Sequence, residues 1–157
     1  MIALGIDPGT RRIGYGVVEN KGNEARFIAA GICTIKSAED ADALVETKRE
    51  IDALIKKHNP VIVAVEKLYF SKNQKTAIAV AQARGVILLA ARENRIPIKE
   101  YAPNEVKLGV TGYGSADKKA VLKMVRLILG KKDLDVIDDA SDALALAILA
   151  GKPYYTH

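Results

Sequence analysis

The chain has 157 residues, of which 49% are hydrophobic, and its formal net charge is +5. A chain of this length is expected to form one domain, over residues 1–157, with a complete hydrophobic core. The basic excess suits a nucleic-acid partner, but many other proteins are equally basic. Its only cysteine, Cys33, excludes a disulfide framework and a cysteine-based zinc site. No basic leader precedes the first apolar run and no run reaches membrane-spanning length, which predicts a cytoplasmic protein without a membrane partner.

The first third of the chain shows the pattern of consecutive strands. Residues 2–7 and 12–19 are apolar runs joined by the turn residues 7–10, Asp-Pro-Gly-Thr, which predicts an antiparallel hairpin. A second turn leads to a third predicted strand over 26–36. These segments predict a three-stranded meander.

The rest of the chain alternates helical and strand patterns. The spacing of apolar residues predicts helices over 37–59, 76–94, 103–109, 115–129 and 138–150, and strands over 61–65 and 97–101. Ser37 resembles the first residue of a capping box and Ser115 a helix cap. The sequence thus predicts an α/β fold with a five-stranded mixed sheet and helices on both faces.

Two of the predicted strands end in a single acid. Asp7 follows the apolar run 2–6, and Glu66 follows the run 61–65. Apolar runs without alternation are typical of central strands covered on both faces. A helical crossover between the strands makes a parallel pair plausible, and the two carboxylates would then share one sheet edge. A carboxylate at such a place loses part of its solvation, and a bound cation can offset that cost.

The last predicted helix carries a second pair of acids. Asp139 and Asp142 are three residues apart and therefore lie on one face of a helix that is otherwise mostly Ala and Leu. Their repulsion can be offset by the positive end of the helix or by a divalent cation between them. Asp138 is a candidate N-cap, which is a common role for Asp at a helix start.

Four carboxylates are therefore the candidate metal ligands: Asp7, Glu66, Asp139 and Asp142. A ligand set of oxygens without His or Cys selects a hard cation, Mg²⁺ or Mn²⁺. Two such ions can hold the attacking and leaving oxygens of a phosphodiester during an in-line displacement. From the residues alone, this favours metal-dependent phosphoryl chemistry.

The long helix over 76–94 has a flat face. Ala77, Ala81 and Gly85 follow at four-residue spacing and would admit close packing of another helix. Two interpretations stay open for this face, a central core helix and a helix that also forms a subunit interface.

With these features assembled, the chain resembles the RuvC family, the bacterial crossover-junction endodeoxyribonucleases with an RNase H-like fold. The resemblance covers nearly the whole chain and rests on five segments in order and at matching spacing. They are GIDPGTRRIGYGVV, VAVEKLYFSKN, AQARGVILLAA, EYAPNEVKLGVTGYGSADKKAV and DDASDALALA.

The resemblance implies roles for individual residues. The family's metal-binding acids fall on the four carboxylates named above, with Asp139 at a position that is His in part of the family. Its basic residues that contact phosphate near the cut map onto Lys107 and Lys118. An aromatic that wedges into the junction, usually Phe, maps onto Tyr69, with Phe70 beside it. Core packing is the alternative for both rings. Ala120 stands where the family usually has Gln.

The activity implied by the resemblance is the resolution of Holliday junctions in homologous recombination and DNA repair. A homodimer would place two sites on a four-way DNA junction, each with two Mg²⁺ ions, for which Mn²⁺ can substitute. Each site would nick one strand and leave a 5′-phosphate and a 3′-hydroxyl. Further DNA contacts are expected from Arg11 and Arg12 beside the first turn and from Lys72 and Lys75 after Tyr69. The family also suggests a branch-migration motor as a partner.

Three alternatives stay open. A YqgF-type nuclease of ribosomal RNA processing also opens with a GxDxG hairpin, but it lacks a run comparable to VTGYGSADK. A sugar-kinase-like or ATPase domain would use Asp7, Gly9 and Thr10 on nucleotide phosphates, but it would need a second domain to close over the nucleotide. A junction-binding module without catalysis would not need the four intact acids.

Overall fold

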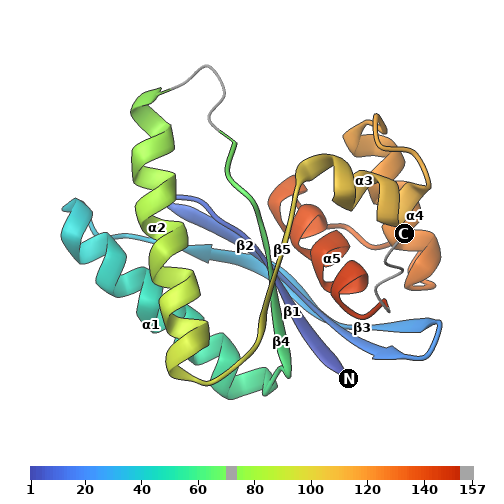
Figure 1. Ribbon diagram of the computed structural model, residues 1–157, viewed down its shortest axis with the longest axis horizontal. Coiled ribbons are helices and arrows are strands. Elements are labelled where there is room, and N and C mark those ends of the chain that lie inside the picture. The colour runs from blue at the N-terminus through green and yellow to red at the C-terminus, as the bar shows by residue number, and fades with distance from the viewer. Residues whose placement is uncertain (70–73, 153–157) are drawn as a thin grey trace.

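The computed structural model describes residues 1–69 and 74–152. Its centre is a five-stranded sheet with the strand order β3-β2-β1-β4-β5 (Figure 1). The strands are β1 (Ile2–Asp7), β2 (Arg12–Lys21), β3 (Glu24–Thr34), β4 (Ile62–Glu66) and β5 (Ile98–Tyr101). The first three strands form an antiparallel meander, whereas β4 pairs in parallel with both β1 and β5. The predicted mixed sheet is confirmed.

The helices cover both faces of this sheet, as predicted. They are α1 (Asp40–His58), α2 (Gln74–Glu93), α3 (Pro103–Thr111), α4 (Lys118–Ile128) and α5 (Asp138–Ala150). Helices α1 and α2 pack on one face and α3, α4 and α5 on the other (Figure 1). Within the described ranges, no helix combines the length and apolar character that crossing a membrane would require.

The two faces of the sheet differ in the size of their side chains. Because successive strand residues point to opposite faces, Leu4 and Ile6 of β1 join the cluster under α1 and α2. Ala3 joins the cluster under α5, and Gly5 also lies on that face, where an added Cβ would come within 1.9 Å of the Ala143 carbonyl oxygen. Helix α5 therefore packs directly against the backbone of the central strands.

Glycines of β2 complete the surface on which α5 packs. A Cβ at Gly16 would lie 2.6 Å from the Leu144 nitrogen, and one at Gly14 would lie 2.2 Å from the Asp139 carbonyl oxygen. Such contacts are far inside normal van der Waals distances, so only glycine permits this approach. The first turn of α5 is consequently held beside the end of β1.

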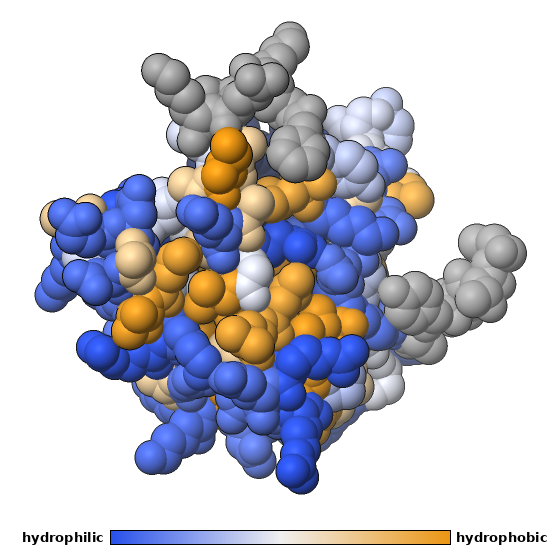
Figure 2. Space-filling view, turned by 60° about the vertical axis from the view of Figure 1, so that its left-hand side comes forward, coloured by the Kyte–Doolittle hydropathy of each residue, from blue (hydrophilic) through white to orange (hydrophobic). Residues whose placement is uncertain are grey.

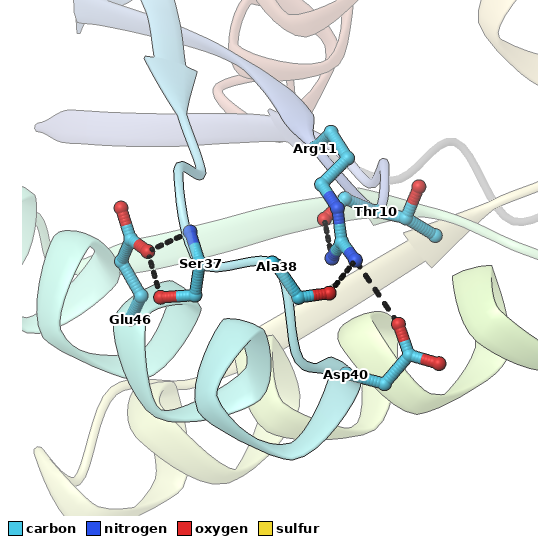
Figure 3. A network of polar contacts seen from close by, with 6 residues as sticks. All are labelled: Thr10, Arg11, Ser37, Ala38, Asp40 and Glu46. Atoms are coloured by element: carbon cyan, nitrogen blue, oxygen red, sulfur yellow. Dashed lines mark hydrogen bonds and ion pairs between the residues drawn. The ribbon is translucent and has the colours of Figure 1, made fainter.

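The helix starts differ from the prediction at the two serines. Helix α1 begins at Asp40, so Ser37 lies before the helix. The Ser37 hydroxyl donates to the carboxylate of Glu46, which lies in the second turn of α1 (Figure 3). The backbone amide of Ser37 donates to the same carboxylate at 2.9 Å. Helix α4 is capped by Asp117 in place of Ser115, because the Asp117 carboxylate accepts the Ala120 amide at 2.8 Å.

Candidate active site

Two of the predicted acids lie at the same sheet edge. Parallel pairing of β1 with β4 sets Ile6 opposite Val65, and the next residue of each strand is Asp7 and Glu66, respectively. The apolar residues before them are fully buried, whereas both acids are half-buried where the strands leave the core. The expectation that the two carboxylates share one edge is confirmed.

Helix α5 brings the other two acids to this edge. Asp7 pairs with Gly14 across the hairpin, and Gly14 is the residue whose missing side chain leaves room for Asp139. Asp142 follows one turn later and is half-buried. Asp138 is the exposed first residue of the helix, and the N-cap is Ile137, so the expectation that Asp138 caps the helix is wrong by one position.

Burial and the charges of neighbouring acids raise the pKa values of Asp7, Glu66 and Asp142, as expected for one electrostatic cluster. Burial raises the pKa of Asp7 to about 7, and the negative charges of Asp142, Glu66 and Asp139 contribute to that shift. Burial likewise raises the pKa of Glu66 and of Asp142, and Asp142 adds to the shift at Glu66. Asp7 interacts with all three of the others, so it lies at the centre of the cluster.

Three cations border the acids. The Lys118 ammonium lies 3.4 Å from a carboxylate oxygen of Asp142, and this proximity raises the pKa of Lys118. The Arg12 guanidinium lies 3.7 Å from the Asp139 carboxylate. The positive charges of Lys118 and Lys107 partly offset the raised pKa of Glu66, which places Lys107 of α3 near the same cluster.

The donor chemistry of this cluster fits a hard divalent cation. All four donors are carboxylates, the ligand type that Mg²⁺ and Mn²⁺ prefer, and their mutual repulsion would be relieved by positive charge. Across residues 1–69 and 74–152, no three Asp, Glu, His or Cys side chains are arranged so that they could hold one ion together. The acids therefore form a charged cluster, in which Asp139 and Asp142 point to neighbouring cations, and not a closed coordination shell.

Arg84 supports the site and was not predicted from the sequence. Its Nε donates to the Glu66 backbone carbonyl at 3.0 Å, and its Nη2 pairs with the Glu100 carboxylate. The side chain is largely buried, so it fixes the backbone where β4 ends. The available signal was an arginine inside the otherwise apolar helix pattern AQARGVILLAA, where a buried cation requires a partner.

The predicted DNA contacts have different surroundings. Arg11 donates to the Ala38 carbonyl at 3.1 Å and pairs with Asp40 at 3.0 Å, so it joins the first turn of the hairpin to the start of α1 (Figure 3). Tyr69 is 62% exposed, so the alternative of core packing does not hold for this ring. DNA contacts by Arg11, Arg12 and Tyr69 stay predictions.

The remaining predicted contacts follow Tyr69 in the chain. Phe70 and Lys72 lie outside the described residues. Lys75 belongs to the first turn of α2, but its side chain is also outside what the structure describes. These three DNA contacts stay predictions.

Comparison with known proteins shows one consistent family. The family model described as crossover junction endodeoxyribonuclease RuvC matches residues 3–150. A protein of that name from Halothermothrix orenii is 46% identical over 155 residues, which cover 98% of this chain and 94% of the relative. Another, from Petrotoga mobilis, is 47% identical over 152 residues, covering 96% and 93% of the two chains.

Solved structures agree with the sequence comparison. Thermus thermophilus RuvC superposes with a TM-score of 0.86 at 33% identity and covers 95% of this chain and 92% of its own. The same protein in complex with a Holliday junction substrate gives a TM-score of 0.84 at 30% identity, with the same coverage. The yeast mitochondrial Holliday junction resolvase Ydc2 shares the fold, with a TM-score of 0.66 at 14% identity over 95% of this chain and 78% of its own.

Proposed function

The chain belongs to the RuvC family of crossover junction endodeoxyribonucleases, and we propose that it resolves Holliday junctions by nicking two strands symmetrically at the acidic cluster around Asp7. It is an enzyme of metal-dependent DNA hydrolysis with an RNase H-like fold. Its biological setting is homologous recombination and DNA repair. The observation that carries the site is the convergence of two strand ends and the first turn of α5 on Asp7.

The residues of the site divide into acids and cations. Asp7, Glu66, Asp139 and Asp142 would hold two Mg²⁺ ions per site, for which Mn²⁺ can substitute. When bound, these ions would activate a water and stabilise the negative charge on the leaving oxygen. Lys118 and Lys107 place positive charge beside the acids, where it can stabilise the negative charge that builds on the phosphate.

The hydrolysis itself balances simply. The water oxygen forms a bond to phosphorus as the bond from phosphorus to the 3′-oxygen breaks, and a proton from the water ends on that 3′-oxygen. The products are a 5′-phosphate and a 3′-hydroxyl, which a ligase can rejoin.

We assign the reaction to residues 1–157 acting as one nuclease domain, since both apolar clusters of the core share one sheet. We also propose that this domain acts in the cytoplasm.

The deciding experiment compares a mobile four-way junction with a linear duplex of the same sequence in Mg²⁺. We expect paired, symmetric nicks in the junction and little or no cutting of the duplex. Asp7→Asn and Asp142→Asn should each lower the nicking rate by at least about 100-fold while junction binding in EDTA persists, because each removes a charged ligand.

A matched control lies in the same turn of α5. Asp138→Asn removes an exposed acid next to Asp139 and should nick at close to the wild-type rate, whereas Asp139→Asn should not. Equal losses in both variants would contradict the assignment of the third ligand. Equal cutting of junction and duplex, or stronger cutting of structured RNA, would contradict the proposed function.

We also propose that the enzyme acts as a homodimer through one face of α2. Ile78, Ala81, Gly85 and Leu89 recur at the spacing of one helix face, and Ile78 and Leu89 are 65% and 51% exposed. Figure 2 shows an apolar patch in the centre of the surface on the side where α1 and α2 lie. An added Cβ at Gly85 would meet no atom within 4 Å, so no part of the described residues covers this position.

This favours the interpretation in which the face of α2 with Ala77, Ala81 and Gly85 also forms a subunit interface. Exposed apolar patches of this kind mark protein interaction sites, and two copies of the chain would supply the two sites that symmetric nicking needs. A branch-migration motor stays a prediction from the family resemblance.

A further inference from the structure

A basic groove lies on the outer side of helix α4, outside the acidic cluster. It has a volume of about 440 Å³ and is lined by Lys119, Leu122, Lys123, Arg126, Leu127 and Lys132. We call it the α4 groove. Four of the six lining residues are cations and none is an acid, which makes the groove a place for an anionic partner.

The α4 groove continues from the active site along one helix. Lys118, Leu122 and Arg126 follow one another at four-residue spacing, so they form one ridge on the surface of α4. The first of them pairs with Asp142 in the acidic cluster, and the other two line the groove. A strand that leaves the site along α4 would therefore meet Lys119, Lys123 and Arg126 next.

The spacing of the cations matches a nucleic-acid backbone. Lys119 and Arg126 are seven residues apart, which is about 10 Å along a helix axis. One DNA strand presents a phosphate about every 3.4 Å along the duplex axis, so the groove spans roughly three phosphates. Arg126 also donates from Nε and Nη2 to the Leu134 carbonyl at 2.9 and 2.8 Å, which holds the chain after α4 against the helix and makes this end of the groove rigid.

We propose that the α4 groove binds the phosphate backbone of a junction arm on its way out of the active site. This rests on the proposed function, and it adds a contact surface that lies beyond the reacting phosphate. Phosphate contacts position a protein on DNA without reading its sequence, so the groove would fix the direction in which an arm leaves. An acidic segment of a partner protein is also negatively charged and is the alternative occupant of the α4 groove. The ridge that begins at Lys118 favours DNA, because it connects the groove to the place where a strand is cut.

The test removes two charges from the α4 groove and compares them with two charges elsewhere. Lys119→Gln with Lys123→Gln is the test variant, since both side chains are exposed and their loss leaves the core intact. The control is Lys56→Gln with Lys57→Gln in the last turn of α1, at the opposite end of the sheet strands from the acids. Net charge changes equally in the two variants, and thermal unfolding confirms that each is folded.

Junction binding is measured without divalent cation between 50 and 200 mM salt. We expect the slope of log affinity against log salt to become shallower by about 1.8 in the test variant, since each lost phosphate contact removes about 0.9. Affinity at low salt should fall roughly tenfold, whereas the control keeps the wild-type slope.

The outcomes separate the two proposals. If the wild-type protein does not nick junctions selectively, the proposed function fails whatever the groove does. If the wild-type protein nicks junctions but the test and control variants show the same salt slope, the groove does not bind DNA, and an acidic protein partner becomes the occupant to examine.

Discussion

At the scale of single residues, the charge of the Asp7 carboxylate lowers the stability of the metal-free protein. Its carboxylate lies where burial and three neighbouring acids all oppose ionisation, and its pKa is accordingly raised to about 7. A divalent cation would reverse this balance by supplying positive charge to the same atoms. Without one, the ionised cluster is a cost to folding.

Replacing Asp7 should therefore stabilise the metal-free protein at alkaline pH. A raised carboxyl pKa contributes stability that is complete below about 3.8, the usual value, and is lost as pH rises through about 7. Asp7→Asn removes this loss. In EDTA at pH 8 the variant should exceed the wild type by on the order of 3 kcal/mol, and the difference should shrink towards pH 4.

Chemical denaturation across this pH range measures the effect. Asp133→Asn, an exposed acid in the connector before α5, is the control and should follow the wild type. Adding Mg²⁺ at pH 8 should stabilise the wild type more than Asp7→Asn. A variant that is less stable than the wild type at pH 8 in EDTA would show that Asp7 is held by favourable contacts and not by opposed charges.

At the scale of elements, the close packing of α5 on the sheet positions the second pair of acids. The glycines of β1 and β2 allow the backbone of α5 to approach these strands, and this sets Asp139 beside Asp7. A large side chain at Gly5, Gly14 or Gly16 would move α5 outward and separate the two pairs of acids. The glycines are thus part of the site without carrying any of its chemistry.

Gly5→Ala should weaken both folding and nicking. Its Cβ would overlap the Ala143 carbonyl oxygen, and backbone cannot move away as a flexible side chain can, so we expect a loss of about 3 kcal/mol or more. Nicking should fall even at temperatures where the variant is folded, because α5 carries Asp139 and Asp142. For the stability measurement, Gly85→Ala is the matched control, since its Cβ meets no atom of the described chain within 4 Å and Ala favours the helix by up to about 1 kcal/mol. A Gly5→Ala protein with wild-type stability would contradict the close packing.

The segment before α1 should detach under acid conditions. Hydrogen bonds from the Ser37 hydroxyl and from the Lys36 and Ser37 amides lower the pKa of Glu46 from its usual 4.5 to about 2. A lowered carboxyl pKa gives stability that is present above about 4.5 and is lost as pH falls towards 2. Glu46→Gln should therefore be less stable than the wild type at pH 7, and the gap should close below pH 3.

Hydrogen exchange at the Lys36 and Ser37 amides checks this locally, because both donate to Glu46 at 2.9 Å. Their exchange should accelerate in Glu46→Gln at pH 7, while amides of β4 keep the wild-type protection. Unchanged exchange would mean that the contacts in Figure 3 do not hold this segment.

At the scale of the whole molecule, the exposed face of α2 should decide the oligomeric state. Ile78→Lys with Leu89→Lys places two charges on that face and should convert a dimer to a monomer, which analytical ultracentrifugation measures. Leu127→Lys on α4, which alters a similarly exposed apolar residue, should leave the dimer intact. If the double variant keeps the wild-type mass in solution, the interface lies elsewhere.

Loss of the dimer should also change the products. A monomer has one acidic cluster, so the α2 variant should give single, unpaired nicks at a reduced rate. Paired nicks from a protein that is monomeric under the assay conditions would contradict the link between symmetry and resolution.

The sequence by itself determined the mixed sheet, the helices on both faces and the four acids that the structure brings together. Strand ends are visible in sequence because a central strand is apolar throughout and stops at the first charge, as β1 and β4 do at Asp7 and Glu66. The parallel pairing that joins these two acids follows from the helical crossover between the strands. The family resemblance assigned Lys107 and Lys118, which the structure places beside the acids.

Only the tertiary structure decided how these parts meet. The approach of α5 to the sheet depends on glycines that are far from it in sequence, so local patterns carry no sign of it. The same is true of Arg84 holding the Glu66 backbone, of Arg12 beside Asp139, and of the α4 groove. Local patterns also did not predict the start of α1, because the hydroxyl of Ser37 donates to the carboxylate of Glu46, nine residues away. Residue types and periodicity are local properties, whereas these contacts arise from the packing of distant elements.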